Sequence, residues 1–108
     1  SLPTRRAIEY MHKSYKQNIT LTSIAKHLGL NKCYFCNIFK KETNMTFSQF
    51  LNNLRIEKSK VLLKNTELSL LDIAVEVGFN NQSYFTIAFK KLNADKTPLE
   101  YRRNLYLT

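Results

Sequence analysis

The sequence predicts an all-α protein of about seven helices, arranged as two helix-turn-helix lobes joined by a long linker helix. Three observations lead to this prediction. The chain holds only two glycines and two prolines in 108 residues, so few positions can break a helix. Apolar residues recur at three- and four-residue steps along most of the chain. One pattern of residues also occurs twice, which indicates that a single supersecondary unit has been used twice.

The repeated pattern joins Ile-Ala, a glycine, Tyr-Phe and Phe-Lys-Lys. Ile-Ala and the glycine recur 49 residues apart, whereas Tyr-Phe and Phe-Lys-Lys recur 50 residues apart. The second copy therefore carries one extra residue after its glycine. The first copy consists of Ile24, Ala25, Gly29, Tyr34, Phe35, Phe39, Lys40 and Lys41, and the second of Ile73, Ala74, Gly78, Tyr84, Phe85, Phe89, Lys90 and Lys91.

The first lobe is expected over about residues 4–45 and contains three helices. Helical spacing of apolar residues predicts these helices over about residues 4–15, 21–28 and 32–43. Thr20 and Asn31 are predicted N-caps, and Gly29 ends the second helix in a turn. The apolar face of the third helix is predicted to consist of Tyr34, Phe35, Ile38 and Phe39.

The linker helix is predicted over about residues 47–65. Asn44 tolerates the left-handed conformation that ends the preceding helix, and Thr46 forms a capping box with Gln49. A helix of this length runs for roughly 28 Å. Its main apolar stripe is predicted to be Phe47, Phe50, Leu51, Leu54, Val61 and Leu62.

The second lobe is expected over about residues 66–108 and repeats the same arrangement. Ser69 is predicted to cap a helix that ends at Val77, and Asn80 or Asn81 to cap a helix that ends near Leu92. A last short helix is predicted to begin with Thr97 as its cap, Pro98 at the first helical position and Glu100 at the third. The predicted buried stripe of the helix before it is Phe85, Ala88, Phe89 and Leu92, and the last helix is expected to close the lobe with Leu99, Tyr101, Arg102 and Leu105.

The charge of the chain indicates a polyanionic partner. Seventeen Lys and Arg residues against eight Asp and Glu residues give a net charge of +9 and an isoelectric point near 9.7. No apolar run approaches the 18 or so residues of a membrane span, and the basic residues do not line one amphipathic helix, so no membrane partner is expected. Since the chain begins with Ser1, we expect a piece of a longer protein. The chemistry of the chain indicates that this protein is cytoplasmic.

The repeated unit itself points to DNA. A short helix, a glycine-containing turn and a second helix with a polar outer face form the helix-turn-helix pattern. The second helix can enter a major groove about 12 Å wide with that face toward the base edges. Two such units in register, in a basic chain, are a much stronger signal than one. No catalytic constellation is present, so neither an enzyme nor a cofactor is expected.

The sequence resembles the DNA-binding domain of AraC/XylS-type bacterial transcription regulators over nearly its whole length. The most specific resemblance lies in Arg55, Ile56, Ser59, Leu62, Leu63, Thr66, Ser69, Ile73, Ala74, Val77, Gly78, Phe79, Ser83, Tyr84, Phe85, Phe89, Lys90, Lys91, Thr97, Pro98, Tyr101 and Arg102. It implies seven helices, with two recognition helices that enter successive major grooves on one side of double-stranded DNA.

The resemblance also implies which residues face the DNA bases, and helical periodicity independently places these residues outward. They are Lys32, Cys33, Cys36 and Asn37 in the first recognition helix, and Gln82, Ser83, Thr86 and Ile87 in the second. Amide side chains can pair with adenine, and methyl groups or cysteine can touch the thymine methyl, so a binding site rich in A·T pairs is expected. Predicted phosphate contacts are Lys40, Lys41, Lys90, Lys91 and Arg102.

The pair Cys33 and Cys36 allows other interpretations. A zinc site needs two further ligands, and only His12 and His27 are available, so no metal site is expected. Redox sensing is an open alternative, because oxidised thiols on a DNA-reading helix would block docking. Reduced cysteines that serve as small apolar contacts are the favoured interpretation.

Protein and RNA are the alternatives to DNA as the main partner. A helical protein-interaction module is the main alternative function, since it would explain the amphipathic helices, although not the acid-free faces of both recognition helices. RNA is disfavoured because A-form grooves do not readily admit a helix. We expect RNA polymerase as a further partner of the regulator. We also expect this piece to be monomeric, with any dimerisation supplied by another domain.

Overall fold

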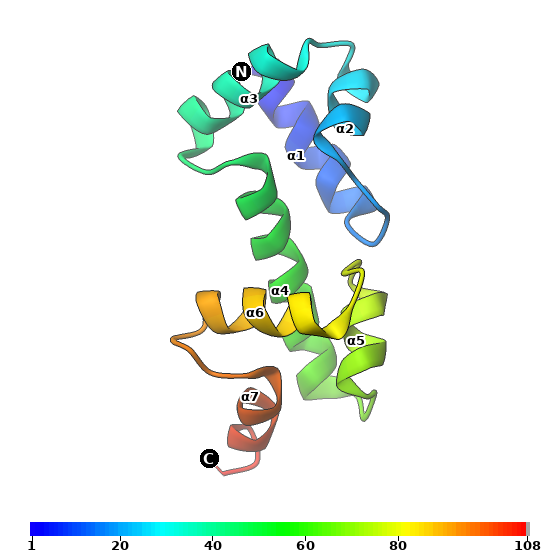
Figure 1. Cartoon of the computed structure of the whole chain (residues 1–108), viewed down its shortest axis with the longest axis vertical. Coiled ribbons are helices and arrows are strands. Elements are labelled where there is room, and N and C mark those ends of the chain that lie inside the picture. Colours follow the sequence, from blue (N-terminus) through cyan, green and yellow to red (C-terminus); the bar gives the residue numbers. More distant parts are fainter. Residues whose placement is uncertain (108) are drawn as a thin grey trace. The chain divides into compact units, whose positions relative to one another are not determined.

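Seven α-helices account for the regular structure of residues 1–107, which are the residues that the computed structural model describes (Figure 1). This confirms the all-α class with seven helices. Thr108, the last residue of the predicted second lobe, lies outside the described residues. The helices are α1 (Leu2–Ser14), α2 (Leu21–Leu28), α3 (Lys32–Thr43), α4 (Phe47–Asn65), α5 (Leu70–Glu76), α6 (Gln82–Leu92) and α7 (Pro98–Asn104).

The chain divides into two compact units. The first unit consists of Ser1–Asn52, and the second begins at Asn53. The division falls inside α4, so this helix contributes its first residues to one unit and its remaining residues to the other. The linker that the sequence predicts as a separate segment thus takes part in both hydrophobic cores.

The core of the first unit lies where α1, α2 and α3 pack against one another. Ala7 and Met11 of α1, Ile24 of α2, and Phe35 and Phe39 of α3 are all fully buried. The ring centroids of the two phenylalanines are 5.5 Å apart. Phe39 also meets Phe50 edge-on at 5.5 Å, which ties the start of α4 to the same core.

The core of the second unit is a chain of aromatic rings that runs from the turn after α5 to α7. The distance between ring centroids is 5.4 Å for Phe79 and Phe85, 6.0 Å for Phe85 and Phe89, and 5.5 Å for Phe89 and Tyr101. Aliphatic residues of α4, of α5 and of the C-cap of α5 are also buried in this unit. The fully or almost fully buried ones are Ile56, Leu63, Ile73, Ala74 and Val77.

The predicted helix caps are present. The Thr20 side chain accepts from the Ser23 N–H in a capping box, the Thr46 hydroxyl accepts from the Gln49 N–H, and Ser69 accepts from Asp72. Thr97 and Glu100 form a second reciprocal box before α7. The predicted left-handed ends are also observed, with φ of 69° at Gly29 and 61° at Asn44.

Several apolar residues that the sequence predicts to be buried are exposed. The exposed fraction is 53% for Tyr34, 54% for Val61 and 44% for Leu92. Helical periodicity gives the centre of an apolar stripe but not its width, and these three residues lie at or beyond the edges of their stripes. The first helix also begins earlier than predicted, at Leu2, because Pro3 is compatible with a first helical turn.

Candidate nucleic-acid interface

Both copies of the repeat fold into the same turn. After α2, the Leu30 N–H donates to the Ala25 carbonyl at 2.9 Å, and after α5, the Phe79 N–H donates to the Ala74 carbonyl at 2.9 Å. These two bonds occupy equivalent positions, 49 residues apart, and the intervening glycine adopts positive φ in both turns. Main-chain geometry therefore confirms that the two segments are copies of one unit.

The extra residue of the second copy is accommodated before the helix begins. Asn31 caps α3 immediately after Leu30, and its Oδ1 accepts from the N–H groups of Cys33 and Tyr34 at 2.8 and 3.2 Å. In the second copy, Asn80 is inserted after Phe79, and it is Asn81 whose Oδ1 accepts from the Tyr84 N–H at 2.7 Å. Both helices therefore retain an asparagine N-cap, which accepts from two N–H groups in α3 and from one in α6.

The two second helices, α3 and α6, present corresponding faces. Phe35 and Phe39 of α3 are fully buried, as are Phe85 and Phe89, which stand 50 residues later in α6. The eight residues predicted to face bases are all accessible to solvent. Lys32, Cys33, Asn37, Gln82, Ser83 and Ile87 are exposed, and Cys36 and Thr86 are half-buried.

The composition of these faces suits an anionic partner. Neither α3 nor α6 has an acidic residue in its first turn, and both carry two lysines in the last turn. The Lys32 ammonium donates to the Thr22 hydroxyl at 3.3 Å, which directs this side chain toward α2. Ile87, at 63% exposure, is an apolar side chain in the middle of the accessible face of α6.

The four lysines predicted to contact phosphates lie at the C-terminal ends of α3 and α6. They are Lys40, Lys41, Lys90 and Lys91. Lys90 forms an ion pair of 3.7 Å with Asp95, a carboxylate that is largely exposed. Exposed ion pairs contribute little to stability, so this pair does not prevent Lys90 from turning toward an anion.

Arg102 has a structural role that the sequence did not reveal. Its Nε, Nη1 and Nη2 atoms donate to the carbonyl oxygens of Leu63, Leu68 and Thr66 at 3.1, 2.7 and 3.2 Å. These carbonyls belong to the last turn of α4 and the residues after it, where a helix leaves acceptors without partners. Three of the five N–H groups of the guanidinium are thereby used, and its phosphate contact stays a prediction.

Arg55 also lies at the site without having been predicted as a contact. Its guanidinium carbon is 5.7 Å from the centroid of the Phe79 ring, and burial lowers the pKa of the group. It lines a small surface hollow of about 190 Å³ beside the start of α6, together with Phe79, Asn80, Asn81 and Tyr84. Arg55 thus supports the turn that leads into α6.

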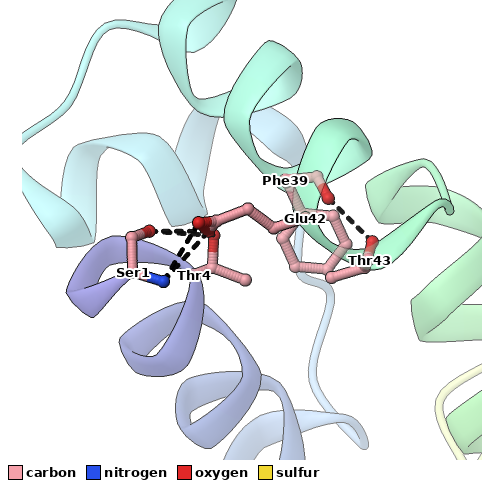
Figure 2. A network of polar contacts seen from close by, with 5 residues as sticks. All are labelled: Ser1, Thr4, Phe39, Glu42 and Thr43. Carbon is pink, nitrogen blue, oxygen red and sulfur yellow. Dashed lines mark hydrogen bonds and ion pairs between the residues drawn. The ribbon is translucent and has the colours of Figure 1, made fainter.

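Glu42 anchors the end of α3 to the beginning of α1 (Figure 2). Its carboxylate accepts from the Ser1 hydroxyl at 2.6 Å, from the Ser1 ammonium at 3.0 Å and from the Thr4 hydroxyl. These hydrogen bonds, with that of the Ser1 hydroxyl the most important, lower the pKa of Glu42 to about 2. This contact could not be predicted from the sequence, because its partners lie about forty residues apart.

Other classes of site are not found in the part of the chain described. Among residues 1–107, no group of three or more His, Cys, Asp and Glu side chains could hold a metal ion. No helix in the same range is long and apolar enough to span a membrane.

Two helix-turn-helix units in one chain, each with an accessible polar second helix, define the class of tandem helix-turn-helix proteins. A model of the helix-turn-helix domain family matches residues 24–104. The Msm operon regulatory protein of Streptococcus mutans is 33% identical over 95 residues, which cover 88% of this chain and 34% of that protein. The chain spans about a third of the length of the first curated relatives that it matches.

Solved structures agree with this assignment. The C-terminal domain of AraT, a response regulator from Geobacillus stearothermophilus, is 38% identical with a TM-score of 0.92 over 96% of this chain and 86% of that one. The DNA-binding domain of AdpA has a TM-score of 0.90 at 17% identity, over 97% of this chain and 94% of that one, which shows a shared fold. The chain belongs to the AraC-type helix-turn-helix family of DNA-binding domains, which is a family of bacterial transcription regulators.

Proposed function

We propose that the chain binds one DNA duplex through both helix-turn-helix units, with α3 and α6 in adjacent major grooves. The observation that carries this proposal is the equivalence of the two helices: each has an asparagine cap, two buried phenylalanines at matching positions, an accessible outer face and two final lysines. AdpA, which shares the fold, was solved in complex with a target DNA. Grooves one helical turn apart are separated by roughly 34 Å.

We assign the base contacts to the eight accessible residues of α3 and α6 named above. Asn37 and Gln82 supply amide groups that match the edge of adenine, and the apolar side chain of Ile87 suits the thymine methyl. An A·T-rich site is therefore expected. Selection of duplexes from a random-sequence pool tests this preference, and half-sites rich in G·C pairs would contradict it.

Phosphate contacts are assigned to Lys40, Lys41, Lys90 and Lys91, with Arg102 as a further candidate through its remaining N–H groups. A net charge of +9 on a chain of 108 residues supports a strong electrostatic component. The test is a fluorescence anisotropy titration of a selected duplex at two salt concentrations. Affinity should fall steeply as the salt concentration rises, and failure to bind any duplex at low salt would contradict the proposal.

We propose that the protein acts as a cytoplasmic transcription regulator. The relatives that the chain matches are regulatory proteins, including the Msm operon and melibiose operon regulators. We propose that the present chain is monomeric and that dimerisation, where it occurs, belongs to another domain. Sedimentation of the free chain and of its complex with one duplex tests this stoichiometry.

RNA polymerase is the proposed protein partner, and the outer face of α5 is the surface that we assign to it. Leu71 and Val75, one helical turn apart, are 51% and 58% exposed. Asp72 lies between them in sequence, and residues 65–89 contain no Lys or Arg. This apolar and acidic face contrasts with the basic chain around it and suits a basic protein surface better than DNA.

A paired measurement tests the assignment of α5. Leu71→Ser with Val75→Ser should weaken binding of purified RNA polymerase to the promoter complex while leaving affinity for the selected duplex within about twofold, because neither side chain is buried. Leu68→Ser is the matched control, since Leu68 is exposed but precedes the helix. Unchanged polymerase binding by the double variant would contradict the assignment.

A further inference from the structure

The two cysteines of the chain lie together on the accessible face of one recognition helix. Cys33 and Cys36 are the only cysteines present, and both are free thiols. Cys33 is exposed and Cys36 is half-buried. Residues three positions apart on a helix share a face, so the two thiols point to the same side as the neighbouring Asn37.

The spacing of the pair is close to that of a disulfide. Cβ atoms three positions apart on a helix are roughly 5–6 Å apart, whereas a disulfide requires about 3.5–4.5 Å. A movement of one or two ångströms within the first turn would therefore suffice. The cysteines are too far apart to be bonded in an undisturbed helix and close enough to become bonded when that turn opens.

The first turn of α3 is the part of the helix that can open most easily. The first N–H groups of a helix have no partner within it. In α3, the N–H groups of Cys33 and Tyr34 are held by the side chain of Asn31 instead. Movement of Cys33 toward Cys36 would thus break the capping bonds to the Asn31 side chain, whereas Phe35, whose N–H donates to the Asn31 carbonyl at 2.9 Å, is fully buried in the core.

We propose that Cys33 and Cys36 form a dithiol modification site for hydroperoxides, and that its oxidation blocks DNA binding by α3. The more exposed Cys33 thiol reacts with a hydroperoxide, R–OOH: its sulfur takes one oxygen, R–OH leaves, and a sulfenic acid forms. The Cys36 sulfur then attacks the Cys33 sulfur, the S–S bond forms, and the sulfenic oxygen leaves as water with the Cys36 proton. Overall, two thiols are oxidised to one disulfide and one hydroperoxide is reduced to an alcohol and water.

The second unit supplies an internal comparison. Ser83 and Thr86 stand 50 residues after Cys33 and Cys36, with the same exposure in the equivalent helix. The repeat thus accepts hydroxyl side chains at both places without loss of the helix. Cys33→Ser with Cys36→Thr therefore gives a variant that cannot form the disulfide and that reproduces residues already present in the fold.

The inference rests on the proposed function, because α3 must contact DNA for its modification to matter. Because Cys33 and Cys36 are themselves assigned to base contacts, each protein is tested with a duplex of about 25 base pairs that the same protein, in its reduced form, selects from a random pool. Hydrogen peroxide should lower the mass of the whole chain by about 2 Da and lower its affinity for this duplex by about tenfold or more, the size of losing a good base contact. A dithiol reductant should restore both, and the Ser/Thr variant should respond in neither measurement.

The outcomes separate the two proposals. If the disulfide forms and the affinity for DNA does not change, the inference is overturned and the proposed DNA binding stands. The same holds if peroxide treatment leaves the mass of the chain unchanged. If hydrogen peroxide lowers the affinity of the Ser/Thr variant by the same factor, the inference is also overturned, because the response to peroxide would then come from other residues. A reduced chain that binds no duplex would overturn the proposed function, and the regulation of DNA binding with it.

Discussion

The Nη1 atom of Arg102 donates to the carbonyl oxygen of Leu68 at 2.7 Å, and this bond ties α7 to the segment that follows α4. Two further bonds from the same guanidinium reach Leu63 and Thr66. One side chain thus satisfies three carbonyls at a helix end, where partners within the helix are missing. The last helix of the second unit therefore has a definite structural function.

Replacement of Arg102 should destabilise the second unit. Arg102→Ala is expected to lower the free energy of unfolding by about 1–3 kcal/mol, since hydrogen bonds from a charged donor to partly buried acceptors are lost. Urea denaturation followed by circular dichroism measures this change. Arg103→Ala is the matched control, because Arg103 is exposed and should change stability by less than about 0.5 kcal/mol. Equal effects of the two substitutions would contradict the role given to Arg102.

The asparagine caps should contribute similar amounts to the free energy of unfolding in the two units. Asn31→Ala and Asn81→Ala are each expected to cost about 1 kcal/mol, because each removes an acceptor for the first N–H groups of its helix. Asn80→Ala provides the control, since Asn80 is exposed and precedes the capping residue. Thermal unfolding of the three variants measures the change in stability. A loss of stability in Asn80→Ala as large as that in Asn81→Ala would contradict the assignment of Asn81 as the cap.

These caps illustrate how much could be predicted from the sequence. Local signals were sufficient for the helices and turns, because an N-cap such as Thr97, a left-handed residue such as Asn44 and an apolar stripe act over a few neighbouring residues. The equivalence of the two units was visible for the same reason. The accessible faces of α3 and α6 followed from the helical period alone.

Contacts between distant residues could not be predicted in this way. The acceptors of Arg102 lie 34 to 39 residues away along the sequence. Ser1 and Thr4, which donate to Glu42, precede it by 41 and 38 residues. No periodic pattern encodes such pairs, because they depend on how the helices pack. The exposure of Tyr34 was missed for a related reason, since the edge of a buried stripe is set by the neighbouring helix.

Glu42 should make stability depend on acid pH. Its pKa is lowered to about 2, so its contribution is fully present above the ordinary glutamate pKa of about 4.3 and is lost as the pH falls through 2. The difference in melting temperature between the wild type and Glu42→Gln should therefore shrink over this range. Glu9→Gln, an exposed change on α1, is the control. A difference that stays constant from pH 5 to pH 2 (about the span that the two pKa values define) would contradict the contact.

The lysines at the ends of α3 and α6 should govern the salt dependence of DNA binding. Lys40→Gln and Lys90→Gln are each expected to reduce the slope of log affinity against log salt by about 0.9, the effect of one phosphate contact. Anisotropy titrations over a range of salt concentrations give the slopes. Lys13→Gln, on α1, serves as the charge-matched control. An unchanged slope for either recognition-helix variant would remove that lysine from the interface.

The central claim, that α3 and α6 read one duplex together, is tested most directly by hydroxyl-radical footprinting of a selected duplex. We expect two protected stretches about 10 base pairs apart. Cys36→Ala with Asn37→Ala should weaken protection in one stretch, and Thr86→Ala with Ile87→Ala should weaken it in the other. A single protected stretch, or two stretches that respond alike to both double variants, would contradict the claim.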